Sequence, residues 1–274
     1  MAITLRKGFK GIMEFRTGTS PVISTKLMRF MSADLPISQE ALIYTGSKPG
    51  VDIRQIFRSG TADINGTIAS VLTNENARYL YDLAKDREEF ELRLVYYQGQ
   101  TKSYTGCKVN TLTFECTAGE VVRFNMAIQA TGFENLSTGD DDPFTVGEKL
   151  VTWDKCRVDF PSGLSVIETS MSSFNYTIDN GLRTIKTHNS DSLFPADQNV
   201  GIQKVNGAFN VYNFQEPPEG TPTASLKLGV ESLEFYIGDL IVRHDVVFHP
   251  AERHPLSPEV IVSTIRWDRV DDLG

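Results

Sequence analysis

Three of the four histidines occur within one short stretch, and their spacing decides whether they could bind a metal ion together. His244, His249 and His254 follow one another at intervals of five residues. Side chains an odd number of positions apart on a strand point to opposite faces, so those of His244 and His249 would diverge. Pro250 and Pro255 indicate a loop for the rest of the stretch. The pattern therefore predicts the tip of a hairpin, with a metal site as the alternative interpretation.

The cysteines and a run of aspartates are further candidates for ligands. Cys107, Cys116 and Cys156 include no closely spaced pair of the kind that holds zinc, so we predict buried, reduced thiols of a cytosolic protein. The carboxylates of Asp140–Asp142 point in different directions, and no cation-binding loop pattern follows them. We interpret this run as the solvated charge of a linker.

No catalytic pattern emerges from the sequence. No serine lies in a nucleophile elbow, no cysteine has a histidine nearby as its base, and no phosphate loop or dinucleotide fingerprint is present. The carboxylates are scattered, so the sequence specifies no pair for acid–base chemistry. We therefore predict a protein that is not an enzyme, with no catalytic residues, no cofactor and no bound metal.

The charge balance limits the partners that the chain could have. Lys and Arg total 27 against 35 for Asp and Glu, which gives a formal net charge of -8. Binding of duplex DNA requires clustered cations, so the balance argues against it and suits a wall past which DNA slides. The sequence contains neither an apolar segment of signal-peptide length near its start nor an apolar run long enough to span a membrane. We expect no membrane partner.

Alternation of apolar with small or polar residues dominates the chain. It is clearest over 61–68, 111–116 and 122–131, where it predicts antiparallel strands with one buried face and one solvated face. A helical pattern from Thr73 to Asp86 is the exception, with Thr73 or Asn74 as its cap. A further strand is predicted from Phe90 to Tyr97. The fold class is therefore mainly β, as antiparallel β-sandwich or open-barrel modules, the first of them with a flanking α-helix.

The order of patterns occurs twice. Glu14–Gly18 and Phe30 in the first half correspond to Asp159–Gly163 and Phe174 in the second, at nearly the same spacing. An irregular segment follows in each half, at 34–52 and 179–198, and each half ends in a hairpin, at 106–117 with 120–132 and at 239–248 with 259–267. We predict two modules of similar topology, at 1–138 and 155–274, joined by an exposed linker at 139–154.

Several stretches carry a resemblance to a known family. Ser172–Leu182, Leu193–Ala196 and Gly201–Phe209 are similar to the tail tube module of long-tailed bacteriophages, with a Ser-Phe strand, an Asn-bearing turn, a loop with proline and a Val-x-Gly step. The first half matches more loosely, at Met28–Phe30 and Ser59–Thr61, and lacks the Asn-Gly turn. The resemblance implies a structural virion protein that is assembled in the host cytoplasm. It also implies rings that stack into the phage tail tube, a channel for DNA passage.

The resemblance also implies partners and site residues. The chain would bind itself and other tail proteins, while DNA passes through the lumen without specific binding. Most members carry one module and form hexamers, so two modules per chain favour a trimer with pseudo-sixfold symmetry. We expect a bore of net negative potential, lined by the polar side chains of Thr61, Asp63, Asn65, Glu115 and Asn210. We expect the irregular segments to contact neighbouring subunits through Leu35, Ile37, Leu42, Ile43, Leu193 and Phe194.

Two alternatives remain at the level of sequence. A tube-like baseplate or tail-tip hub, or a tube initiator, would share the module but form a single ring. A two-domain β-sandwich that binds or cleaves carbohydrate would need exposed aromatic side chains. The two tryptophans, Trp153 and Trp267, both lie in apolar contexts, which favours packing roles for them.

Overall fold

A computed structural model describes residues 11–18, 24–38, 41–48, 51–58, 62–96, 100–137, 149–160, 170–185, 197–212, 230–249, 252–257 and 260–270. The fold is mainly antiparallel β with one α-helix among these residues, which confirms the predicted fold class. Within the described part of the chain, no helix is long and apolar enough to cross a membrane.

Among the described residues, the first half has eleven strands and the helix. They are β1 (Gly11–Thr17), β2 (Ser24–Phe30), β3 (Ser32–Asp34), β4 (Ile37–Ser38), β5 (Ala41–Lys48), β6 (Val51–Arg58), β7 (Asp63–Val71), α1 (Asn74–Asp86), β8 (Phe90–Tyr96), β9 (Gln100–Thr117), β10 (Arg123–Ala130) and β11 (Gly132–Ser137). The predicted helix and the strands predicted from their alternating patterns are all present.

The second half is built from strands and one short 3-10 turn, η2 (Trp153–Lys155). Its strands are β12 (Cys156–Asp159), β13 (Met171–Asp179), β14 (Arg183–Ile185), β15 (Asp197–Asn199), β16 (Lys204–Tyr212), β17 (Val230–Ile237), β18 (Leu240–Phe248), β19 (Glu252–Ser257) and β20 (Val260–Arg269).

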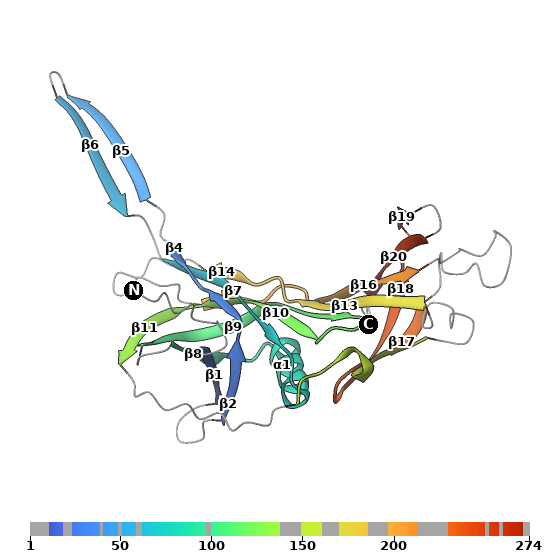
Figure 1. Ribbon diagram of the computed structural model, residues 1–274. Helices are drawn as coiled ribbons and strands as arrows, with labels where there is room; N and C mark the ends of the chain where they lie inside the picture. Colours follow the sequence, from blue (N-terminus) through green and yellow to red (C-terminus); the bar gives the residue numbers. More distant parts are fainter. Residues whose placement is uncertain are drawn as a thin grey trace, which may run out of the picture.

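One sheet of sixteen strands runs through both halves. Its main path is β12-β17-β18-β20-β16-β13-β9-β10-β7-β3. The halves meet where β9 pairs with β13, from Ser173 opposite Thr117 to Asp179 opposite Thr111. Figure 1 shows these central strands as one continuous layer across the molecule.

The two halves share an order of pairing. In the first half the neighbours run β3-β7-β10-β9-β8-β1, and in the second they run β13-β16-β20-β18-β17-β12. In the first half α1 lies between β7 and β8 in the chain. The strands β2 and β11 are additional there, since β2 pairs with β1 and β11 pairs with β9.

The long strand β9 belongs to two layers. Its first part pairs with β8 and β11, and its second part pairs with β10 and β13. Gly106 has a φ of +59° at the change of partners, and a Cβ there would lie 1.9 Å from the Thr131 hydroxyl. Glycine is therefore required for the bend that carries β9 from one layer to the other.

Aromatic side chains hold the two layers of the second half together. Phe235 on β17 packs against Trp267 on β20 and Tyr176 on β13, with ring centroids 4.8 and 5.3 Å apart. It also lies 6.2 Å from Phe209 on β16. The strand β17 therefore covers the apolar face of β13, β16 and β20, which is a sandwich arrangement.

The helix α1 covers the same apolar face near the junction of the halves (Figure 1). Leu80, Leu83 and Ala84 form its buried stripe, and the Tyr81 ring lies 6.3 Å from that of Tyr176. The N-cap Thr73 makes no side-chain capping hydrogen bond, in contrast to the predicted cap.

A second-half asparagine closes the C-terminal end of α1. Asn180 is fully buried, and its amide donates to the carbonyls of Ala84 and Val109, each at 2.8 Å. Its own oxygen accepts a hydrogen bond from Gln203 at 2.8 Å. These bonds satisfy carbonyls that would otherwise be buried without partners, and they tie α1 to the second half.

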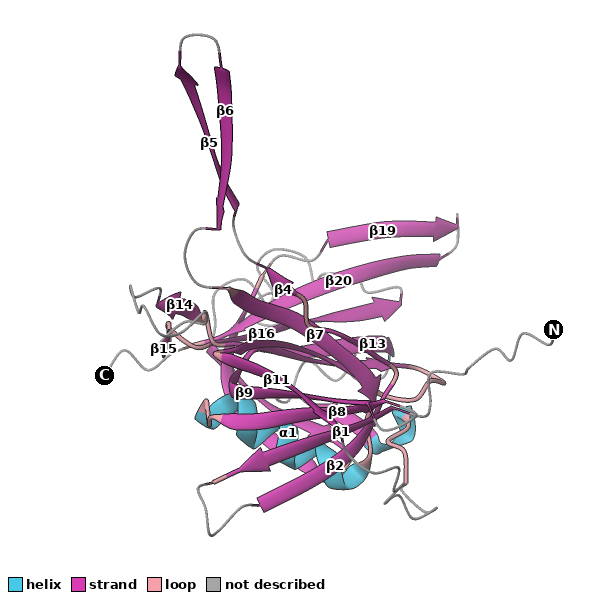
Figure 2. Ribbon diagram, turned by 90° about the vertical axis from the view of Figure 1, so that its left-hand side faces the viewer, coloured by secondary structure: helices cyan, strands magenta, loops and turns pink. Residues whose placement is uncertain are grey.

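Three sequence expectations differ from this fold. The segment 34–52 is not irregular throughout, because β5 pairs with β6 in a long hairpin that projects from the body (Figure 2). Strand β18 pairs mainly with β17 and meets β20 over only three residue pairs. In the predicted linker, Val151 is fully buried and hydrogen-bonds Leu72 and Val122, so this part is not exposed.

Replacing Asn180 tests the closure of α1. Asn180→Ala leaves the Ala84 and Val109 carbonyls buried without a donor, and we expect the free energy of unfolding to fall by about 2–4 kcal/mol. Urea unfolding measures this loss. The exposed Asn125 provides the control, because Asn125→Ala should change the free energy by less than about 0.5 kcal/mol. Equal effects of the two variants would contradict the role given to Asn180.

Candidate functional surface

The large sheet has one face of small and polar side chains that extends over six of its strands. Cross-strand partners point to the same side of a sheet, so the registers determine which residues share this face. Asn125 aligns with Thr113, Thr113 with Thr177, and so on across six strands. The row is Ala69, Asn125, Thr113, Thr177, Asn206 and Asp268.

Two further rows extend the same face toward the start of β13. The first is Val71, Arg123, Glu115, Asn175, Ala208 and Arg266. The second is Thr117, Ser173, Asn210 and Thr264. The intervening residues, such as Phe114, Phe124 and Phe209, point to the opposite side and are buried. The face is therefore a wall of small and polar side chains backed by an aromatic core.

Hydrogen bonds along the rows fix these polar side chains. Asn210 donates to the Ser173 hydroxyl and accepts from the Thr264 hydroxyl, both at 2.8 Å. The hydroxyls of Thr113 and Thr177 are hydrogen-bonded at 3.0 Å. The wall is thus held rigid across the junction of the two halves.

Charges of both signs lie on this face. On the six central strands the acidic residues are Asp63, Glu115, Asp179 and Asp268, and the basic residues are Lys108, Arg123, Lys204 and Arg266. Arg123 is directly opposite Glu115, and Lys204 is directly opposite Asp179. By register, Asp34 on β3 and Glu252 on β19 lie on the same face, so with them the described part of the face carries six acidic and four basic residues. A bore of net negative potential remains a prediction.

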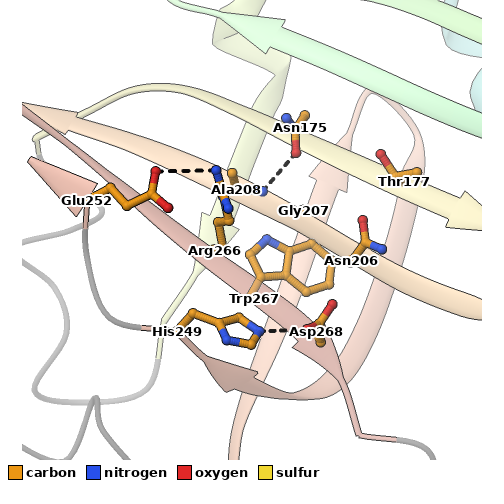
Figure 3. Close-up of a pocket in the computed structure, with 10 residues that line it drawn as sticks. All are labelled: Asn175, Thr177, Asn206, Gly207, Ala208, His249, Glu252, Arg266, Trp267 and Asp268. Carbon is orange, nitrogen blue, oxygen red and sulfur yellow. Dashed lines mark hydrogen bonds and ion pairs between the residues drawn. The ribbon is translucent and has the colours of Figure 1, made fainter. Parts of the chain in front are cut away.

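A pocket of about 760 Å³ interrupts the wall over β13, β16 and β20 (Figure 3). Gly207 makes room for the buried Trp267 ring, since a Cβ at Gly207 would lie 2.7 Å from the indole. At the rim, Arg266 pairs with Glu252 at 3.3 Å, and the His249 ring lies 2.6 Å from the Asp268 carboxylate. These side chains already have partners within the chain, which leaves them less available to bind a charged ligand.

The structure places most of the predicted lumen residues together. Asp63, Asn65, Glu115 and Asn210 all lie on the polar face by register. Thr61 lies outside the described residues. That these side chains line a bore remains a prediction, since the geometry places them on one face of one chain.

The predicted contact residues are more dispersed. Ile37 is exposed, whereas Leu35 is buried within the chain itself, where the Tyr104 hydroxyl donates to the Leu35 carbonyl at 3.5 Å. Leu35 is therefore shielded from solvent by its own chain, in contrast to the expectation that it contacts a neighbouring subunit. Leu42 and Ile43 lie on β5, of which the backbone alone is described. Leu193 and Phe194 lie outside the described residues.

The large exposed apolar side chains gather at the two ends of the central strands, a feature that the sequence analysis missed. One end, where β7 and β16 finish, holds Met31, Leu150, Tyr212 and Ile261. The opposite end, where β7 and β16 begin, holds Ile37, Ile185, Ile202 and Val270. Ile202 is 78% exposed. One further exposed residue, Ile241, lies on β18.

The histidines are bound to separate partners. The His244 ring is within 2.6 Å of the Tyr176 hydroxyl, and the His249 ring is within 2.6 Å of the Asp268 carboxylate. His254 lies on β19, where the backbone alone is described. Among the described residues, no group of three potential ligands could hold a metal ion.

Part of the chain is similar to a known protein family. Residues 92–213 match the family described as phage tail tube protein. This stretch begins in β8 and ends just after β16, so it includes the pairing of β9 with β13 that joins the halves. No curated protein matches the chain.

The His244 environment predicts a pH dependence of stability. Burial, with the nearby charges of Arg269 and Lys85, lowers the pKa of His244 from 6.5 to about 4, while Asp245 opposes the shift. Between these values the unfolded chain binds a proton that the native chain does not, so stability falls as the pH falls. We expect a loss of at most about 3 kcal/mol from this group. His244→Gln should show a smaller loss in urea unfolding at pH 4.5 relative to pH 7, and an unchanged loss would contradict the assignment.

Proposed function

Residues 92–213 of this chain belong to the phage tail tube protein family, and on that premise we propose that its copies assemble into stacked rings that enclose a channel for DNA. The chain is then a structural component of the virion tail. The observation that carries the proposal is the polar face of the large sheet, which is continuous from β7 to β20. A sheet with one apolar face against its own core and one rigid polar face is suited to line an aqueous bore.

The charges of this face suit passage of DNA without binding. Tight binding to phosphates needs cations that are free to replace counterions. Arg123 and Lys204 each face a carboxylate on the neighbouring strand, and Arg266 pairs with Glu252. We propose that Asp63, Asn65, Glu115 and Asn210 face the lumen, where cross-strand pairing keeps the wall from adhering to DNA.

The repeated order of pairing supports two tandem modules and suggests how a ring closes. By position, β18 and β19 together correspond to β9, because both of them pair with β20. In the first half, β9 pairs with β10 along one edge and with β13 along the other. In the order of pairing, β3 next to β7 corresponds to β13 next to β16. We propose that β19 of one copy pairs with β3 of the next, which repeats the internal junction. Three copies would then close a ring with pseudo-sixfold symmetry.

The apolar ends of the strands support stacking of rings. The two ends of the central strands carry different residues. When one end of a copy contacts the opposite end of the next copy, the two contacting surfaces differ, and the interface is heterologous. Heterologous contacts that do not close produce open filaments. Burial of side chains as exposed as Ile202 would provide the driving force. The β5–β6 hairpin, which projects from the body (Figure 1), and the segment that holds Leu193 and Phe194 are proposed to contact neighbouring subunits and other tail proteins.

The alternatives have less support. Binding of carbohydrate would need several exposed aromatic side chains on one face. Trp267 is 1% exposed, and the exposed Tyr212 lies at the end of β16. The Trp153 ring lies 6.1 Å from that of Phe174. A baseplate or tail-tip hub, or a tube initiator, shares the module and differs in forming one ring. That alternative is separated from a tube by experiment.

Electron microscopy of the purified full chain tests the proposal. We expect long hollow tubes, with a trimer as the smallest ring in native mass spectrometry of dissociated tubes. Single rings that do not stack would indicate a hub or initiator. Hexameric rings would mean that only one half of each chain lines the channel. A monomer at all concentrations would contradict self-assembly.

Cysteine cross-linking tests the proposed ring junction. Asp34→Cys on β3 is combined in turn with Glu252→Cys, His254→Cys and Ser257→Cys on β19. We expect one combination to give covalent trimers in assembled tubes under mild oxidation, while each single variant gives none. Tubes that form normally without cross-links in any combination would show that the ring closes through other edges.

A further inference from the structure

Two pairs of strands correspond residue by residue between the halves, beyond their shared order of pairing. Asp34 on β3 lies opposite Thr67 on β7, and Asn175 on β13 lies opposite Ala208 on β16. One constant spacing in the sequence relates the first-half pairs to the second-half pairs. It relates Ser32–Ala69 to Ser173–Asn210, Asp34–Thr67 to Asn175–Ala208, Ile37–Ile64 to Ile178–Val205, and Ser38–Asp63 to Asp179–Lys204. The strands β3 and β4 together are therefore the counterpart of β13.

Two glycines at the same spacing show which way the backbone of β3 faces. A Cβ at Gly66 would lie 2.0 Å from the Asp34 carbonyl oxygen, and a Cβ at Gly207 would lie 2.2 Å from the Asn175 carbonyl oxygen. Both carbonyls therefore point to the neighbouring strand, β7 in the first half and β16 in the second. Successive residues of a strand direct their backbone groups to opposite edges, so the N–H of Ala33 faces away from β7.

The edge of β13 that corresponds to this outward edge is occupied within the chain. The strand β9 pairs there, with Asn175 opposite Glu115. The Asn180 N–H donates to the Asn110 carbonyl at 2.8 Å. Because hydrogen-bonded pairs alternate with the others along a ladder, Asn175 and Glu115 form a non-hydrogen-bonded pair. The outward edge of β3 and β4 pairs with no strand among the described residues.

A pocket of about 280 Å³ lies beside this outward edge, and Leu35 and Ile37 contribute to its lining. The counterpart of Leu35 is Tyr176, by the same spacing. The Tyr176 ring packs against those of Phe114 on β9 and Tyr81 on α1, with ring centroids 6.5 and 6.3 Å apart. Side chains of the first half thus fill the space beside Tyr176. The pocket beside Leu35 leaves similar space for a neighbouring copy.

The strand registers determine which residue of β19 takes the place of Glu115. In the first half, the step from Val71 through β10 reaches Glu115 on β9. In the second half, the counterpart of Val71 is Tyr212, and the same step through β20 reaches His254 on β19. His254 is therefore the counterpart of Glu115 in the backbone register.

We propose that the outward edge of β3 and β4 binds β19 of the next copy with Asp34 opposite His254, and that the Ala33 N–H donates to the incoming strand. This register rests on the proposed pairing of β19 with β3 and adds the residues that meet. A slip of one residue would turn the polar side of β19 away from that of β3. Pro36 leaves the outward edge intact, because the N–H that it lacks would face β7, as the backbone of Asp34 does.

Cysteine pairs in the full chain test the register. Non-hydrogen-bonded partners have Cα atoms about 4.5 Å apart, which a disulfide spans, whereas a partner two residues along lies roughly 7–8 Å away. We expect Asp34→Cys with His254→Cys to give covalent oligomers as the main product of mild oxidation. Asp34→Cys with Glu252→Cys should give few. Asn175→Cys with Glu115→Cys is the matched control, since the equivalent pair should link within one chain.

Removal of one backbone donor tests the edge by a second route. Ala33→Pro removes the N–H that faces outward, and an edge strand tolerates proline at such a position. The variant should keep its fold by circular dichroism, while association of copies should weaken roughly tenfold at each junction. Ala33→Gly keeps the N–H and should associate like the natural chain. Sedimentation over a range of concentrations measures the association.

The outcomes distinguish a wrong register from a failure to form tubes. Tubes in which Asp34→Cys links to Glu252→Cys or Ser257→Cys would overturn the register, as would an Ala33→Pro variant that assembles as readily as Ala33→Gly. Covalent oligomers through Asp34→Cys and His254→Cys without tubes would support the register and contradict the tube. If Ala33→Pro does not fold, the cysteine pairs decide alone, and no cross-link in any combination would overturn the proposed edge.

Discussion

The backbone pairing of β9 with β13 is the constraint on which the rest of the structure depends. It aligns the polar rows of the first half with those of the second, from Thr117 to Thr111. A slip of one residue would turn every second-half side chain to the other face, exposing Phe174 and Tyr176 and burying Asn175 and Thr177. The register is therefore held by the aromatic core as much as by the hydrogen bonds, and the polar face follows from it.

The helix α1 stabilises this junction from the apolar side. Two of its last carbonyls receive hydrogen bonds from the second half. The buried Ala84 carbonyl accepts from Asn180, and the exposed Lys85 carbonyl accepts from Gln203. A buried carbonyl without a hydrogen-bond donor is destabilising. The last turn of the helix therefore depends on the second half for its hydrogen bonds. The halves share a pairing order, but they also share one continuous core cluster, so each depends on the other for packing.

The sequence predicted the elements whose signal is local. Alternation along β7, β9 and β10 and the helical spacing of Ala77, Leu80 and Ala84 follow from the geometry of each element alone. The β5–β6 hairpin was missed although Pro49-Gly50, between the paired Lys48 and Val51, is a common turn dipeptide. The pairing of β18 with β17 and the burial of Leu35 depend on residues distant in the chain, and one sequence carries no direct signal for them.

The sequence predicted which residues share one side of the sheet, but not the charge of that side. Polar positions on alternating strands are visible in the sequence, so Asp63, Asn65, Glu115 and Asn210 could be assigned to one side. The net charge of this side could not be predicted in the same way. The net charge of the sequence is a property of the whole chain, whereas the residues that share one side of the sheet are determined by the strand registers. By register, Arg123 lies opposite Glu115 and Lys204 opposite Asp179, so charges of opposite sign are neighbours on the central strands. Neighbouring charges of opposite sign largely cancel beyond a Debye length. If this face lines the proposed channel, DNA would meet few cations that are free to bind its phosphates.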